Sequence, residues 1–299
     1  MNQEKCNIGG QAVIEGVMMR APGQLAIAVR TTEGDIVVRK EDIAIDRNPI
    51  LKKPFLRGLI GLYDALVLGI KALNFSVQQS GANENKPITK KETVFSLIIG
   101  LGLGVALFVF LPLWLTNLIF PANDHSSLLY NAVDGIIRVI FFIAYIFIIS
   151  RLKDIQRVFE YHGAEHKSIF VYEEGMDLSV ENARKMSRFH PRCGTSFLLI
   201  VMVVAIAVFS LIPNTAAFVI KFLSRIFFLP IIAGVSYEIL KLSGKYSGKR
   251  FIKLIAAPGL WLQRLTTREP DDSQLEVAIA SINAALAEDN TQLNGVRYV

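Results

Sequence analysis

The sequence is poor in cysteine and in charged residues. Only two cysteines, Cys6 and Cys193, occur in 299 residues. This excludes a disulfide framework and leaves each thiol to act as a free thiol or a metal ligand. Charged residues make up 19% of the chain, against roughly 25% in ordinary soluble domains. Apolar residues make up 52%, and the mean hydropathy is +0.41. The composition therefore predicts a membrane protein rather than two soluble domains.

No apolar segment follows the first residues, so we predict no cleavable secretory signal. The net charge of +6 and the isoelectric point near 9.3 would also suit a nucleic-acid-binding protein. The basic residues are not interleaved with aromatic residues, however, and no nucleic-acid partner is expected. In a membrane protein such an excess is typical of Lys and Arg gathered on the cytosolic face.

Four apolar runs are read as transmembrane helices, since a span needs about 20 mostly apolar residues. They cover residues 93–120, 133–150, 195–212 and 216–240. Pro112 predicts a kink near the end of the first run. The fourth run is predicted to be a kinked span, because four residues interrupt it: Lys221, Arg225, Pro230 and Glu238.

The positive-inside rule gives an orientation for these spans. Lys and Arg are frequent in residues 86–91, 151–192 and 241–253, and they are absent from residues 121–132. The connection at 121–132 is therefore predicted to lie outside, and both termini are predicted to be cytosolic. The expected location is the bacterial cell membrane, with a multi-pass topology.

The remaining segments give weaker signals. Alternating apolar residues at 25–30 and 36–39 predict a β-hairpin. Residues 55–73 form an apolar helix with one polar stripe, which favours an interfacial helix over a fifth span. An amphipathic helix is predicted after Pro270. The predicted order is a β-rich cytosolic module at 1–54, an interfacial helix and linker at 55–92, two spans within 93–150, a cytosolic motif segment at 151–194, two spans within 195–242, and a cytosolic carboxyl-terminal part at 243–299.

Two histidines and a glutamate occur in the order His-x-x-Glu-His, as His162, Glu165 and His166. They lie within residues 156–172, which are predicted to form a helix with its stop at Gly175. On a helix, positions i and i+4 share a face, so both imidazoles can reach one metal ion. The order is that of the inverzincins, in which the glutamate acts as general base. The alternative is a pair of solvated histidines, or histidines paired with Glu160 or Glu165.

A second segment adds two residues that can bind metal, His190 and Cys193, just before the third predicted span. Zinc accepts imidazole nitrogen and thiolate sulfur, and catalytic sites commonly use three protein ligands. We therefore expect a divalent metal, with zinc as the first choice, and either residue could complete the site. The alternative is that Cys193 is a buried small apolar residue and His190 part of a turn.

Two further acidic residues are candidates for the same site. Glu15 is a lone acid among glycine and apolar residues, and Glu238 lies at the cytosolic end of the fourth predicted span. A carboxylate next to the membrane is a functional hypothesis by default. For Glu238, a salt bridge to Lys241 or to an arginine of a neighbouring helix is an equal alternative.

Four blocks together resemble the YqhQ-type family of bacterial multi-pass membrane proteins. They are residues 9–20, 162–167, 190–197 and 266–270, and the similarity runs from about residue 7 to about residue 285. The resemblance implies a helical membrane protein that has been described only as a predicted metal-dependent enzyme.

The sequence thus predicts an α-helical integral membrane protein with two rival functions. The first is a metal-dependent hydrolase at the cytosolic interface, with Glu165 as the base and a lipid or membrane peptide as the substrate. The second is a non-enzymatic scaffold or assembly factor, in which the same cluster holds a structural metal or ties the module to the bundle. A closed four-ligand site would favour the scaffold, and an open site the enzyme.

Overall fold

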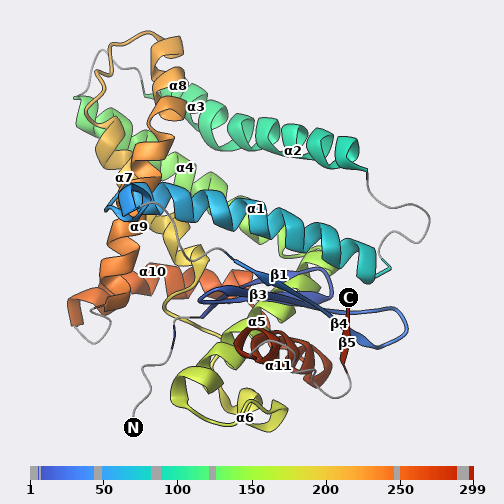
Figure 1. Cartoon of the computed structure of the whole chain (residues 1–299). Coiled ribbons are helices and arrows are strands. Elements are labelled where there is room, and N and C mark those ends of the chain that lie inside the picture. The colour runs from blue at the N-terminus through green and yellow to red at the C-terminus, as the bar shows by residue number, and fades with distance from the viewer. Residues whose placement is uncertain are drawn as a thin grey trace.

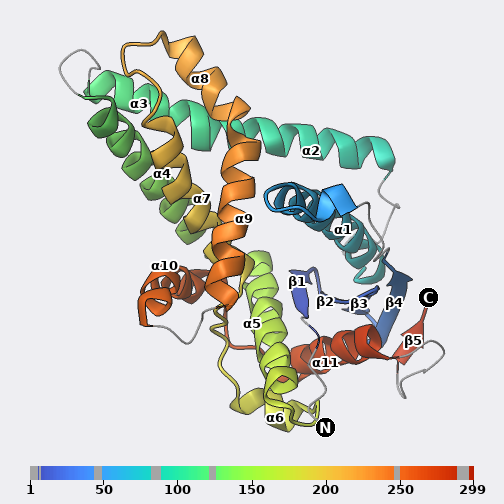
Figure 2. The ribbon, with the colours of Figure 1, turned by 60° about the vertical axis from the view of Figure 1, so that its left-hand side comes forward.

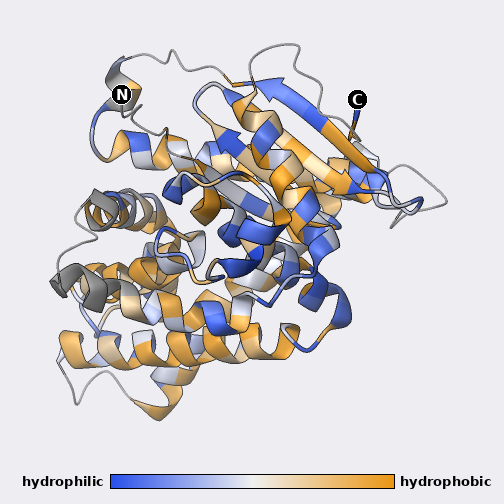
Figure 3. Ribbon diagram, turned by 90° about the horizontal axis from the view of Figure 1, so that it is seen from below, coloured by the Kyte–Doolittle hydropathy of each residue, from blue (hydrophilic) through white to orange (hydrophobic). Residues whose placement is uncertain are grey.

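The computed structural model describes residues 6, 8–43, 49–81, 89–120, 126–245, 250–287 and 296–299. A small sheet with its covering helices forms one part of the molecule, and a bundle of longer helices forms the other (Figure 1). Hydrophobic residues dominate the long helices, whereas hydrophilic residues are more frequent around the sheet (Figure 3).

The sheet has five strands in the order β1-β2-β3-β4-β5. They are β1 (Gly9–Val13), β2 (Gly16–Ala21), β3 (Gln24–Arg30), β4 (Ile36–Asp42) and β5 (Val296–Tyr298). The predicted hairpin is confirmed, because β3 and β4 pair antiparallel from Gln24↔Asp42 to Arg30↔Ile36. The carboxyl-terminal β5 adds to β4 in parallel, which the sequence did not indicate. Strand β1 lies at the opposite edge.

Helices cover both faces of this sheet. On one face lie α5 (Lys153–Glu174) and α11 (Asp272–Leu286), with the short α6 (Val180–Lys185) beside them. The predicted helix after Pro270 is α11, and Asp271 and Gln274 form a capping box at its start. On the other face lies α1 (Leu56–Gln79), whose Ala72 and Phe75 pack against the sheet. The opposite side of α1 exposes apolar residues, as expected for an interfacial helix.

The bundle contains two helices that are long and apolar enough to cross a membrane. The first, Lys91–Ile119, is continuous through α2 (Lys90–Val105), the π-helical η2 (Ala106–Phe110) and α3 (Leu111–Ile119). The π turn stands directly before Pro112 and lets the helix continue past it. The second is α4 (Ser127–Ile149). Residues 121–125 of the predicted outside connection lie beyond the described residues.

The other two predicted spans are shorter or broken. Helix α7 (Gly194–Phe209) has 16 residues, and at 1.5 Å per residue it is shorter than a hydrocarbon core of about 30 Å. The fourth run forms α8 (Phe218–Phe227) and α9 (Leu229–Lys245), which are bent by 45° at the break. Figure 2 shows α7 beside α9, with α10 (Arg250–Thr266) and α5 at their lower ends. Among the described residues, two helices qualify as spans, or three if the bent pair is one span.

Candidate functional site

Helix α5 carries both histidines of the His-x-x-Glu-His motif. The helix predicted over residues 156–172 is present, and it ends at Gly175, whose φ of 75° is left-handed. Cys193 is the N-cap residue of α7. These elements bring together three residues, His162, His166 and Cys193, whose ligand atoms all lie within 4.8 Å of one another.

Hydrogen bonds to backbone carbonyls orient the two imidazoles. His162 Nδ1 is 2.8 Å from the carbonyl oxygen of Thr266, and His166 Nδ1 is 2.5 Å from that of Arg188. A carbonyl can only accept, so each neutral ring carries its proton on Nδ1 and keeps a lone pair on Nε2. His162 Nε2 faces Cys193 Sγ at 3.2 Å. His166 Nε2 is buried and has no hydrogen-bond partner among the described residues.

This donor set fits a metal ion of the zinc type. A backbone carbonyl on the second ring nitrogen is the usual support of a metal-binding histidine. Burial lowers the pKa of His166, which keeps the ring neutral, as a ligand must be. Cys193 is buried, and the backbone N–H of Thr195 points at its sulfur at 3.4 Å, at the start of a helix. Zinc commonly takes four ligands, so these two nitrogens and one sulfur would leave one position for water or a substrate.

His190 lies beside this group but is not part of it. Its ring centroid is 5.6 Å from that of His166, and its Nε2 lies 3.3 Å from Glu173. Gln263 of α10 forms two hydrogen bonds of 2.8 Å with the His190 backbone. Its Oε1 accepts from the His190 N–H, and its Nε2 donates to the His190 carbonyl oxygen. Burial lowers the pKa of His190 to about 4. The sequence alone did not reveal Gln263.

Glu165 points toward the sheet instead of into the cluster. Its carboxylate accepts a hydrogen bond from the backbone N–H of Ala12 in β1. A Cβ on Gly10 would stand 2.8 Å from its Cγ, so only glycine allows this approach. Burial raises the pKa of Glu165, while the nearby His162 and His190 oppose that shift.

The two additional acidic candidates lie elsewhere. Glu15, in the β1–β2 turn, forms an ion pair with Arg157 and accepts a hydrogen bond from the Tyr161 hydroxyl at 3.2 Å. Glu238 is paired with Arg57 of α1, whose Nε lies 2.8 Å from Oε1. Of the two partners considered for Glu238, an arginine from a neighbouring helix is the one observed. Neither carboxylate is in the group of metal-binding geometry.

The segment after α10 reaches the site only because residue 163 is glycine. A Cβ there would stand 2.1 Å from the carbonyl oxygen of Arg268. The close contact includes a hydrogen bond of 2.9 Å from Arg268 N to the Phe159 carbonyl. It places Thr266 where its carbonyl meets His162. The block at residues 266–270 was the one signal in the sequence that pointed to this segment.

Comparison with known proteins identifies the family. The model of the family described as "Protein of unknown function (DUF1385)" matches residues 53–288. The chain is 37% identical over 307 aligned positions to "Uncharacterized protein YqhQ" of Bacillus subtilis (strain 168), covering 94% of each chain. No solved structure matches. Neither description states an activity, so the enzyme implied by the resemblance has no support from these comparisons. The chain belongs to the DUF1385 family, as the resemblance to YqhQ-type proteins predicted.

Proposed function

We propose that the protein is a membrane-embedded, metal-dependent hydrolase with its site at the cytosolic interface. The observation that carries the proposal is the orientation of His162 and His166, whose Nδ1 atoms are both held by backbone carbonyls. This leaves two Nε2 lone pairs beside Cys193 in a buried place. Zinc is the ion that best suits two nitrogens and one sulfur.

We further propose a bacterial cell membrane location with four spans and both termini cytosolic. The two candidate spans, the bent pair α8–α9 and the apolar α7 support it, as does the distribution of Lys and Arg. In a Cys6→Ser/Cys193→Ser background, a cysteine at Ser126 should react with a membrane-impermeant maleimide in intact cells. A cysteine at Gly175 should not, and the reverse pattern would place the cluster on the outer side.

The residues around the cluster suit hydrolysis. When bound, zinc supplies Lewis acidity toward the carbonyl or phosphoryl group of a substrate. His162, His166 and Cys193 would hold the ion, and the carbonyls of Thr266 and Arg188 keep both rings in the binding tautomer. Glu165, whose pKa burial raises, would act as the base by turning from the Ala12 N–H toward the cluster. It would take one proton from the attacking water and return it to the leaving group. One water is consumed, and one bond of the substrate is broken.

One observation favours the scaffold as a second candidate. Glu165 accepts the Ala12 N–H and packs against Gly10, which ties α5 to the sheet. In a scaffold this contact would be its whole role, and the metal would be structural.

Incorporation of heavy oxygen tests the proposal without knowledge of the substrate. The purified protein is incubated with lipids and peptides extracted from its membranes in water enriched in oxygen-18, with zinc or with a chelator. We expect products labelled with one heavy oxygen only with zinc, and their loss in Glu165→Gln. Glu174→Gln, at the exposed end of α5, is the matched control. Zinc-loaded protein that yields no labelled product would favour the scaffold.

A further inference from the structure

The outer edge of strand β1, beside the site, pairs with no described strand and is open at Gly10, whereas Glu165 occupies the Ala12 N–H. The pair Val13↔Gly16 closes a two-residue turn, so Val13, Gln11 and Gly9 direct their N–H and C=O groups toward β2. Gly10 and Ala12 therefore direct theirs away from the sheet, and no described strand pairs with them. The Ala12 N–H confirms this alternation, because it donates to Glu165 from α5.

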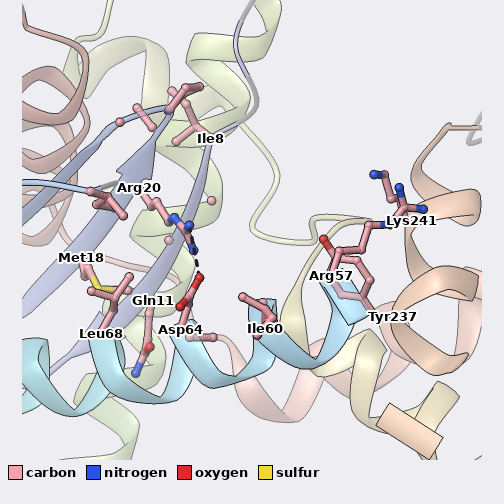
Figure 4. Close-up of a pocket in the computed structure, with 18 of the residues that line it drawn as sticks. Ile8, Gln11, Met18, Arg20, Arg57, Ile60, Asp64, Leu68, Tyr237 and Lys241 are labelled. Atoms are coloured by element: carbon pink, nitrogen blue, oxygen red, sulfur yellow. Dashed lines mark ion pairs between the residues drawn. The ribbon is translucent and has the colours of Figure 1, made fainter. Parts of the chain in front are cut away.

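A cavity of about 920 Å³ lies next to this edge. It is lined by Gly9, Gly10 and Gln11 of β1, by one side of α1, and by Tyr237 and Lys241 of α9. Figure 4 shows Arg20 and Asp64 facing each other across it, with Arg57, Tyr237 and Lys241 at one end. Its volume is within the range of about 300–1,000 Å³ typical of ligand sites.

The first residues of β1 leave the cavity open. A Cβ on Gly9 would meet no atom within 4 Å. Gln11, on the same side of the strand, reaches Gly69 of α1. An incoming chain at Gly9 and Gly10 would therefore meet backbone, without a strand side chain in its way.

The lining carries charges of both signs in pairs. Arg20 lies 3.9 Å from Asp64, and Arg57 is paired with Glu238. Apolar residues, among them Met18, Ile60 and Leu68, fill the rest of the wall. Lys241 adds one positive charge beyond these two pairs. A lipid phosphate would use that charge, but it would leave the outward N–H and C=O groups of Gly10 unpaired. An extended peptide instead uses free N–H and C=O groups together with mixed side-chain contacts.

We propose that β1 and this cavity bind an extended polypeptide segment, which adds to the sheet as a further strand. Binding of the segment does not depend on the metal. That the bound peptide is also the substrate of hydrolysis rests on the proposed function. The geometry favours it because the Glu165 carboxylate oxygen Oε1 lies 2.9 Å from the position of a Cβ on Gly10. A peptide on this edge would pass directly beside the proposed base.

Binding of a fluorescent pool of random heptapeptides to the full-length protein in detergent tests this inference. A second pool is methylated on alternate backbone nitrogens, which removes the donors that strand pairing needs. We expect the methylated pool to bind at least tenfold more weakly. Gly10→Pro, which lacks the outward N–H, should weaken binding about fivefold relative to Gly10→Ala, since one hydrogen bond is lost. Both variants place the same Cβ against Glu165.

A second variant keeps the test decisive if Gly10→Pro does not fold. Gly9→Trp fills the cavity and should abolish binding, whereas Gly9→Ala should leave it unchanged. Equal binding of the two pools would overturn the proposal, as would displacement of the peptides by dihexanoyl phosphatidylglycerol but not by unlabelled peptide. Peptide binding should persist in His162→Ala/His166→Ala. Wild-type protein that binds peptide but retains no zinc and gives no turnover would count against the hydrolase alone. Wild-type protein that binds zinc but no peptide would count against this inference alone.

Discussion

Two clusters of buried polar side chains differ in how their reactive atoms are used. The metal-centre cluster, so called for the ion that we propose it binds, consists of His162, His166 and Cys193. The Arg225 cluster lies in the bundle between α4 and α8, and its members are Asn131, Asp134, Arg138, Lys221 and Arg225. Most members of both clusters are buried, and His162 and Arg138 are partly exposed.

In the Arg225 cluster each charged head group is held by polar partners. Arg225 contacts Asp134 at 3.0 Å and Asn131 at 3.1 Å, and Arg138 contacts the same carboxylate at 2.9 Å. The Lys221 ammonium is shared among Asn117, Tyr130 and the Asn214 carbonyl. In the metal-centre cluster a backbone carbonyl holds one nitrogen of each ring. The other nitrogen of His162 faces only the Cys193 sulfur, and that of His166 has no hydrogen-bond partner among the described residues. Asp134 Oδ1 and Arg138 Nε of the Arg225 cluster also lack a hydrogen-bond partner among the described residues, so an unpartnered buried atom does not by itself identify a site. The metal-centre cluster differs because three atoms of metal-binding type converge within 4.8 Å.

Removing the carboxylate of the Arg225 cluster should have the largest effect on stability. Asp134→Leu leaves two buried guanidinium groups without an anionic partner, and we expect a loss of about 3–5 kcal/mol in the free energy of unfolding in detergent. The zinc content of the folded fraction should not change. Glu181→Ala, which removes an exposed ion pair with Lys185, is the control and should cost less than about 0.5 kcal/mol. A parallel loss of zinc would show that the clusters are coupled.

Gly163→Ala tests whether the second ring nitrogen of His162 needs its carbonyl. The new Cβ would stand 2.1 Å from the Arg268 carbonyl oxygen, so the segment carrying Thr266 must move. We expect a cost of about 3 kcal/mol and a weaker affinity for zinc, measured by competition with a chelator. Gly194→Ala, where a Cβ meets nothing within 4 Å, should retain both properties. Unchanged zinc affinity in Gly163→Ala would show that the Thr266 carbonyl is not needed to orient His162 for zinc binding.

Acidification should weaken the fold through His190. Burial lowers its pKa from 6.5 to about 4, so the unfolded chain binds more protons between these values. The contribution of the neutral His190 ring to the free energy of unfolding is fully present above pH 6.5. It is lost as the pH falls toward 4, and the loss at pH 5 is about 2 kcal/mol. In metal-free protein, His190→Gln should flatten this part of the stability curve. A slope identical to that of the wild type would contradict burial as the cause.

Glu15→Gln should have the smallest effect. The ion pair with Arg157 is partly exposed, and such pairs contribute about 0.2–1 kcal/mol. We expect a loss of that size with unchanged zinc content, because Glu15 is outside the metal-centre cluster. Loss of zinc in this variant would show that Glu15 does contribute to metal binding.

The sequence predicted local elements well, because local signals determine them. The hairpin of β3 and β4, the α5 helix with its stop at Gly175, and the capped α11 follow from alternation, periodicity and turn residues. It also placed His162 and His166 on one helical face. Long-range contacts carry no such signal. Three contacts join residues far apart in the chain: the pairing of β5 with β4, the hydrogen bond of His162 to the Thr266 carbonyl, and the hydrogen bonds of Gln263 to the His190 backbone.

The candidate site shows the same limit at the level of single residues. Spacing could not choose between His190 and Cys193 as the third ligand, and it grouped Glu15 and Glu238 with the site. In the structure, Cys193 caps α7 beside both imidazoles. His190 faces Glu173 instead, and each of the two glutamates is paired with an arginine. Hydropathy counted four spans, and the kink predicted for the fourth run is present as the 45° bend between α8 and α9.

X-ray absorption spectroscopy at the zinc edge tests the central claim most directly. It is applied to the purified full-length protein after loading with zinc and removal of excess metal. The account predicts one zinc ion per chain, with one sulfur at about 2.3 Å and two imidazole nitrogens at about 2.0–2.1 Å. In Cys193→Ser the sulfur signal should disappear. A protein that retains no zinc, or a zinc site without sulfur in the wild type, would contradict the assignment of His162, His166 and Cys193 as a metal centre.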